Sequence, residues 1–180
     1  MAVYVLRLGH RADRDKRVTT HLFLAARAFG ASGGMYSGRR DPSLEETVRN
    51  VASDWGGSFG LEFSESWRDA IKAWKRSGAV VHLTMYGLPL RRVIRAIRDD
   101  PSDKLVVVGG AKVPGEVYAQ ADWNVSVTSQ PHSEVSALAV FLHELNEGRE
   151  LDVAFEGGRL RVVPHEHGKR VEELSGEFKI

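Results

Sequence analysis

Short runs of β-branched and other apolar residues alternate with stretches of helical periodicity along most of this 180-residue chain, and this alternation constrains the fold more than any other feature. The apolar run Leu105–Val108 is typical of a strand that is covered on both faces. Repeated strand–helix alternation predicts an α/β fold with a mostly parallel sheet and helices on both faces. The expected strands are 2–8, 34–36, 58–63, 80–84, 105–108 and 124–127, and the expected helices are 19–29, 43–55, 67–76, 90–97, 115–120 and 135–145.

The pattern changes after residue 150. Two short runs, Leu151–Phe155 and Arg159–Val163, flank Glu156-Gly157-Gly158, and this arrangement predicts a β-hairpin. The polar tail from His165 is expected to be loose. We therefore expect a main domain over residues 1–150 and a C-terminal β-hairpin with its tail over residues 151–180.

Membrane and metal-binding classes find little support in the sequence. No apolar run approaches the ~18 residues needed to cross a bilayer, and the opening segment MAVYVLRLGHR lacks the long apolar part of a signal peptide. The absence of cysteine excludes disulfides and thiolate metal sites. His165 and His167 have no third ligand nearby in the sequence, so we expect no bound metal. These features favour a cytoplasmic protein without membrane contacts.

Positive charge in this chain is local. The net charge is only +1, so any binding of nucleic acid requires a basic surface confined to part of the molecule. Two clusters qualify, and each is as consistent with a solvated face as with a binding surface. They are Arg7, Arg11, Arg14, Lys16 and Arg17, and then Arg91, Arg92, Arg95 and Arg98.

Three expected strands end in segments that combine small and polar residues, namely 83–87, 108–114 and 127–134. Ligands of open α/β sheets bind beyond the carboxyl ends of strands, and glycine lets the backbone approach a ligand closely. Together the three segments can surround a flat, partly apolar molecule such as an adenine nucleoside.

Each of these segments, taken singly, also fits a structural role. Gly109-Gly110 fits a tight turn, Pro131 or Ser133 fits a helix start, and His132 fits a hydrogen-bonded structural histidine. The sequence contains neither G-x-G-x-x-G nor G-x-x-x-x-G-K-[ST], so the common phosphate-binding loops are absent. A dinucleotide-binding oxidoreductase is therefore disfavoured.

Four segments, taken together, resemble one family. They are LRLGHR at 6–11, RDKRVTTH at 14–21, HLTMYG at 82–87 and QPHSEV at 130–135. The chain from Ala2 to about Val163 is similar to the archaeal tRNA (cytidine-56) 2'-O-methyltransferases of the SPOUT superfamily. This resemblance implies a SPOUT-type C-terminal trefoil knot, a homodimer, the cofactor S-adenosyl-L-methionine, and methylation of the ribose of cytidine 56 in the tRNA T loop. It also implies a C-terminal hairpin.

The resemblance implies a role for particular residues. The expected cofactor-binding residues are Leu83, Met85, Gly87, Gly109, Gly110, Ala111, Lys112, Val113, Val127, Thr128, Ser129, Gln130, Pro131, His132, Ser133 and Glu134. The essential arginine of the family matches Arg17, which is the expected catalytic residue. The expected RNA-facing residues are Arg7, Arg11, Arg14 and Lys16.

The chain departs from the family pattern in two places. Gly110-Ala111 stands where relatives often have Ala-Glu, and Thr128-Ser129 stands where relatives can have Gly-Asn. A carboxylate at position 111 is therefore not a required base here if the activity is retained. Arg17 cannot ordinarily serve as a base, because its guanidinium stays protonated. We expect Arg17 to hold a phosphate or to stabilise the developing alkoxide.

Two alternatives remain open at this point. A knotted methyltransferase acting on a different RNA position would share the fold and the cofactor. A non-catalytic α/β module that binds RNA or a nucleotide would share the loops but would transfer no methyl group.

Overall fold

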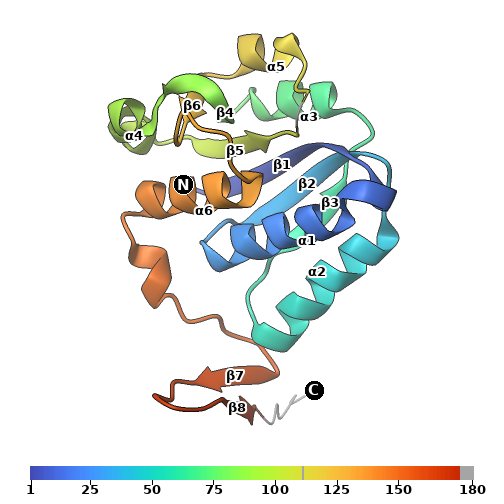
Figure 1. Ribbon diagram of the computed structural model, residues 1–180, viewed down its shortest axis with the longest axis vertical. Helices are drawn as coiled ribbons and strands as arrows, with labels where there is room; N and C mark the ends of the chain where they lie inside the picture. Colours follow the sequence, from blue (N-terminus) through green and yellow to red (C-terminus); the bar gives the residue numbers. More distant parts are fainter. Residues whose placement is uncertain (111, 175–180) are drawn as a thin grey trace.

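Six parallel strands form the central sheet of the computed structural model, which describes residues 1–110 and 112–174 (Figure 1). The strand order is β3-β2-β1-β5-β4-β6, and every neighbouring pair is parallel. The prediction of a mostly parallel sheet is confirmed. The strands are β1 Val3–His10, β2 Gly33–Gly38, β3 Gly60–Phe63, β4 Gly78–Pro89, β5 Asp103–Val108 and β6 Trp123–Ser126.

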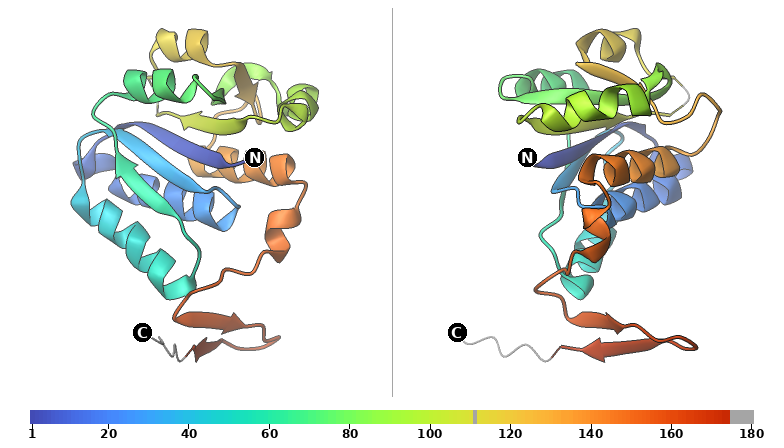
Figure 2. Two further views of the ribbon diagram at one scale, coloured as in Figure 1. Left: turned by 180° about the vertical axis from the view of Figure 1, so that it is seen from behind. Right: turned by 90° about the vertical axis from the view of Figure 1, so that its left-hand side faces the viewer.

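Helices cover both faces of this sheet, as predicted (Figure 2). Four helices contribute to the larger core on one face, and α3 and α5 contribute to the smaller core on the other. The four are α1 Ala12–Ala28, α2 Pro42–Trp55, α4 Leu90–Asp99 and α6 Glu134–Asn146, and the other two are α3 Trp67–Trp74 and α5 Gly115–Gln120.

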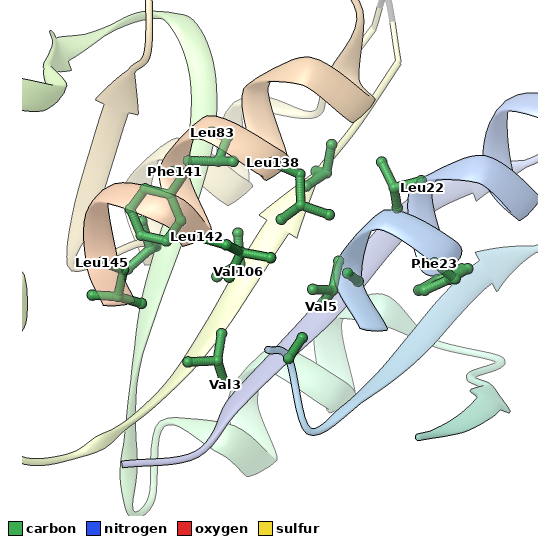
Figure 3. Packing of buried hydrophobic residues seen from close by; sticks show 14 of the residues in the cluster. Val3, Val5, Leu22, Phe23, Leu83, Val106, Leu138, Phe141, Leu142 and Leu145 are labelled. Atoms are coloured by element: carbon green, nitrogen blue, oxygen red, sulfur yellow. The ribbon is translucent and has the colours of Figure 1, made fainter. Parts of the chain in front are cut away.

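The side chains of β1 alternate between the two cores, as the pleat of a strand requires. Val3 and Val5 lie in the larger core, whereas Leu6 and Leu8 lie in the smaller one. In Figure 3, side chains of α6, including Leu138, lie over the strands of the larger core. Each fully buried aliphatic side chain contributes about 1.5–3 kcal/mol, so the two cores give the loops at the sheet edge a stable frame.

The order of the strands reverses between β1 and β5. The chain runs outward from β1 through β2 to β3 on one side, and β5, β4 and β6 lie on the other side. In open α/β sheets the crevice at such a reversal, beyond the carboxyl ends of the strands, is the usual place for a ligand. Arg7 pairs with Val108 at the carboxyl end of this β1–β5 pair.

The carboxyl end of β4 departs from a regular ladder. Val125 of β6 pairs with both Leu83 and Leu88, so residues 84–87 leave the pairing between these two positions. Gly87 lies against the β6 backbone, and a Cβ at this position would stand 2.5 Å from the carbonyl carbon of Asn124. The glycine therefore permits the excursion of residues 84–87. The strand is also longer than the predicted 80–84 because it continues beyond this irregularity.

Helix α1 begins at Ala12, well before the predicted start at residue 19. The residues from 12 to 18 have no apolar stripe, so periodicity gave no sign of a helix there. The helical turn is supported instead by electrostatics: Arg11 forms a bidentate pair with Asp15, at 2.8 and 3.0 Å. Asp13 and Asp15 also lie in the first turn, where the helix dipole favours negative charge.

The predicted position of the C-terminal hairpin is wrong. Residues 149–152 form a 3-10 helix (η1, Arg149–Asp152), and no strand forms over 151–155. The hairpin lies one segment later, where β7 Leu160–Val163 pairs with the antiparallel β8 Arg170–Glu173 (Figure 2). The tail expected to be loose from His165 therefore contains a strand, and residues 175–180 lie outside the described part of the chain.

The Gly157-Gly158 pair docks against the body instead of turning a hairpin. Glu156 accepts a hydrogen bond from the Gly57 amide at 2.8 Å. A Cβ on Gly158 would stand 2.5 Å from the Gly56 nitrogen. Two backbones meet closely here, in the loop after α2, and this long-range contact replaces the local turn that the sequence suggested.

Candidate active site

The three strand-end segments meet in one cavity of about 400 Å³ at the carboxyl ends of β4, β5 and β6. We call it the first cavity. The predicted cofactor-binding residues that line it are Leu83, Met85, Gly109, Gly110, Val113, Val127, Thr128, Gln130, Pro131, His132, Ser133 and Glu134. Three others, Gly87, Lys112 and Ser129, lie outside its lining, and Ala111 falls outside the described residues.

Other lining residues of the first cavity were not among the predicted cofactor-binding residues. Thr84, Tyr86 and Val108 lie within the strand-end segments that the sequence indicated, and His82 is the direct neighbour of one of them. Tyr118 projects from the short helix α5, and no local pattern marked it. These additional lining residues are His82, Thr84, Tyr86, Val108, Tyr118, Val125 and Ala137.

A chain of hydrogen bonds fixes His82 at the base of this cavity. The Asn124 side-chain amide donates to the Tyr118 carbonyl at 2.9 Å, which turns the Asn124 Oδ1 toward His82 Nδ1 at 2.8 Å. The Nδ1–H of His82 therefore donates, and its Nε2 carries a free lone pair. Nε2 is buried and has no hydrogen-bond partner among the described residues.

Burial lowers the pKa of His82 below its ordinary value of 6.5, and the hydrogen bond with Asn124 only partly opposes this shift. The imidazole is thus neutral at physiological pH. The Tyr118 ring stands edge-on to it with centroids 4.6 Å apart, and the Tyr118 hydroxyl lies 2.9 Å from Thr84 Oγ1. These contacts hold the polar base of the cavity rigid.

The loop between β6 and α6 is shaped by its own side chains. Thr128 Oγ1 accepts from the Gln130 amide at 3.1 Å. Ser133 is the N-cap of α6 and accepts from the Val135 amide at 3.2 Å. His132 is exposed, with Nδ1 3.1 Å from the Ser133 carbonyl. The side chains of Thr128, His132 and Ser133 therefore hold the backbone of this loop in place.

The predicted cations of the N-terminal cluster fall into two groups. Arg11, Arg14, Lys16 and Arg17 are exposed at the start of α1, as a surface role requires, and Arg17 lines none of the cavities described here. Arg7 does not lie on the surface: its side chain is 4% exposed and its Nη2 stands 3.5 Å from Glu134 Oε1. The expected surface position of Arg7 is therefore wrong, because β1 carries it under the helices.

The described residues contain no cluster of three or more His, Cys, Asp or Glu side chains placed to hold a metal ion. Within the same residues, no helix combines the length and apolar character that crossing a membrane requires. The first cavity instead offers apolar walls, a buried neutral imidazole and loop backbone. Such a lining suits an uncharged heteroaromatic group with polar edges.

Comparison with known proteins gives a consistent result. A family model described as "tRNA ribose 2'-O-methyltransferase, aTrm56" matches residues 55–172. A tRNA (cytidine(56)-2'-O)-methyltransferase of Methanothermobacter thermautotrophicus is 55% identical over 175 residues, which is 97% of this chain and 98% of that protein. The protein of the same name from Methanopyrus kandleri is 57% identical over 171 residues, covering 94% of this chain and 96% of that one.

Solved structures share the fold at low sequence identity. An RNA 2'-O ribose methyltransferase superposes with a TM-score of 0.62 and 18% identity over 82% of this chain and 57% of that one. The TrmH/SpoU tRNA modifying enzyme of A. aeolicus gives a TM-score of 0.60 and 14% identity over 83% of this chain and 76% of that one. An AdoMet-bound rRNA methyltransferase from Sinorhizobium meliloti gives a TM-score of 0.59 and 20% identity, over 81% of this chain and 56% of that one.

Proposed function

The chain belongs to the tRNA ribose 2'-O-methyltransferase family, and on that premise we propose that it transfers a methyl group from S-adenosyl-L-methionine to the ribose 2'-hydroxyl of cytidine 56 in the tRNA T loop. The observation that carries the proposal is the meeting of three strand-end segments in the first cavity. These are the segments that the resemblance assigns to the cofactor.

The residues of the first cavity fit this cofactor. Leu83, Val125 and Val127 offer apolar walls to an adenosine. His82 Nε2, buried and without a hydrogen-bond partner among the described residues, is an acceptor suited to an amino group. The Glu134 carboxylate in the lining also suits the positively charged sulfonium.

The chemistry of the methyl donor limits what the protein must do. The bound cofactor supplies a methyl group that its sulfonium already activates. The protein must hold the ribose hydroxyl in line and ease the loss of its proton, and positioning alone can contribute roughly 7–11 kcal/mol. We assign to Arg17 the stabilisation of negative charge on the ribose oxygen or on a neighbouring phosphate, since a guanidinium donates but does not accept a proton.

Arg17 lies outside the lining of both cavities described above, so the proposal includes a second copy of the protein. In a homodimer with twofold symmetry, an exposed residue of α1 in one protomer can complete the site of the other. Arg11, Arg14 and Lys16 lie on the same exposed helix start and are proposed to contact RNA phosphates. Such contacts weaken as salt rises.

Three further features belong to this proposal. A trefoil knot is expected from the family. Tracing the chain in an experimental density map tests the knot. We also propose that residues 1–150 form the methyltransferase domain, with 151–180 as an appended hairpin and tail. A tRNA substrate favours a cytoplasmic location.

The direct test is incubation of the purified protein with methyl-labelled S-adenosyl-L-methionine and an unmodified tRNA transcript, followed by mapping of the label. We expect one 2'-O-methylcytidine at position 56, and no product when this cytidine is replaced by uridine. Label at another nucleotide would identify a different target. Binding of the cofactor and tRNA without transfer would point to a non-catalytic module.

A further inference from the structure

A second cavity of about 700 Å³ lies beside the first, at the carboxyl ends of β1 and β2. The two cavities share Gly110 and Val113, so the loop after β5 forms their common wall. The second cavity opens at the β1–β5 crevice, where the strand order reverses. A ligand here would lie next to whatever occupies the first cavity.

Arg7 lies at the base of this second cavity and is largely without partners. Its side chain is 4% exposed. Nε and Nη1 are buried and have no hydrogen-bond partner among the described residues. The remaining nitrogen, Nη2, faces Glu134 Oε1 at 3.5 Å, which is an ion pair at long range without a hydrogen bond.

Such a group is costly in a folded protein. A buried charge is stable only when it is paired and hydrogen-bonded. A buried donor without an acceptor carries its own desolvation penalty. The guanidinium of Arg7 stands 3.5 Å from the Glu134 carboxylate, and two of its three nitrogens have no hydrogen-bond partner among the described residues. A phosphate would supply the acceptors that this guanidinium lacks, because arginine binds phosphate through charge-assisted hydrogen bonds.

The other charges around the second cavity leave Arg7 as the main free cation. Arg11 is neutralised by Asp15, and Arg68 is neutralised by Glu116 at 2.6 Å. At the rim, Lys112 adds a positive charge and Glu65 adds a negative one. Lys112 and Glu65 offset each other in net charge, so the attraction for an anion comes from inside the cavity.

We propose that the second cavity is the subsite of the target nucleotide, where the guanidinium of Arg7 binds a backbone phosphate next to the methylated ribose. This inference rests on the proposed function. The shared wall at Gly110 and Val113 sets the ribose beside the first cavity. Trp67 and Ser66 line the same space and offer an aromatic wall and a hydroxyl to the nucleotide.

The first experiment replaces Arg7 by Met and by Lys. Arg7→Met keeps the volume without the charge, so the melting temperature should stay the same or rise. We expect at least a hundredfold loss of kcat/KM for tRNA, a change of less than threefold in the Kd of S-adenosyl-L-methionine, and a partial rescue by Arg7→Lys. Arg76→Gln, an exposed position before β4 at the opposite edge of the sheet, is the matched control.

The second experiment measures binding without turnover. Cytidine 3',5'-bisphosphate and cytidine are titrated into the wild-type protein and into Arg7→Met. We expect the wild type to prefer the bisphosphate by at least tenfold, and the variant to lose this preference. The 3'- and 5'-monophosphates then identify which phosphate Arg7 holds.

Several outcomes would overturn the inference while leaving the proposed function intact. One is that the wild type methylates tRNA and that the kcat/KM of Arg7→Met is within threefold of the wild-type kcat/KM. Another is equal preference for the bisphosphate in both proteins. A third is a large rise in the cofactor Kd of Arg7→Met, which would assign Arg7 to the first cavity. Absence of methyl transfer by the wild type would instead contradict the proposed function, and the bisphosphate titration would still test the subsite.

Discussion

At the scale of single residues, the clearest effect is expected from substitution of Gly87. Its Cα lies against the backbone of Asn124, and a Cβ would stand 2.5 Å from it. Gly87→Ala must displace one of two backbones, which we expect to cost about 1–3 kcal/mol and to weaken cofactor binding by distorting residues 84–86. Calorimetry and cofactor titration measure both effects.

Gly60→Ala is the control for this prediction, because nothing lies within 4 Å of a Cβ at Gly60. It should leave stability and cofactor affinity nearly unchanged. A stable Gly87→Ala protein with wild-type affinity would show that the excursion of β4 does not depend on the glycine.

The protonation state of His82, which lines the first cavity, makes the stability of the protein depend on pH. Burial lowers its pKa in the folded protein below the ordinary value of 6.5, so the unfolded chain binds the proton more readily. Stability is therefore full above about pH 6.5 and declines as the pH falls below it. We expect the melting temperature to drop between pH 7.5 and pH 5.5, with a smaller drop in His82→Gln.

His10 contributes to the same pH dependence, since burial also lowers its pKa. The substitution at His82 should thus reduce the effect without removing it. If the wild type and His82→Gln lose equal stability over this range, the imidazole of His82 is not neutral in the fold.

At the scale of elements, the contact between residues 156–158 and the loop after α2 determines where the hairpin lies. Gly158→Val introduces a side chain where the Gly56 nitrogen stands 2.5 Å from a Cβ. We expect this variant to release the segment from 153 to 174 and to become sensitive to limited proteolysis there. Cofactor affinity should not change, because no residue of 151–174 lines the first cavity.

Gly168→Val provides the matched change within the same hairpin, at a position where the nearest atoms belong to the flexible His165 side chain. It should keep the wild-type proteolysis pattern. Resistance of Gly158→Val to proteolysis would mean that other contacts of the segment are sufficient to hold it.

At the scale of the whole molecule, the proposed dimer makes Arg17 testable by complementation. Arg17→Ala should abolish turnover while leaving cofactor affinity intact. Gly109→Val, whose side chain would meet Val113, should abolish cofactor binding. If each active site takes Arg17 from the partner, a random mixture of the two variants should regain about a quarter of the wild-type activity, since half of the dimers then hold one complete site.

Activity of the mixture no greater than the sum of the separate variants would contradict a site shared between protomers. Sedimentation of the wild type measures the oligomeric state independently. If the protein is a monomer at the assay concentration, no site can be shared between protomers. Retention of turnover in Arg17→Ala alone would remove Arg17 from the mechanism.

The sequence by itself determined the alternation of strands and helices and which segments follow the strand ends. Both are local properties: apolar periodicity selects the element, and small residues mark where a parallel strand can meet a ligand. The first cavity was predictable in outline for this reason, because all carboxyl ends of a parallel sheet lie at one edge.

Only the tertiary structure decided the rest. Arg7 belongs to a basic cluster in the sequence, yet its place on the central strand β1 buries it, since the helices cover both faces of that strand. Tyr118 and the docking of Gly158 depend on contacts between segments far apart in the chain. Such contacts form only when the whole sheet assembles, and no local pattern of residues encodes them.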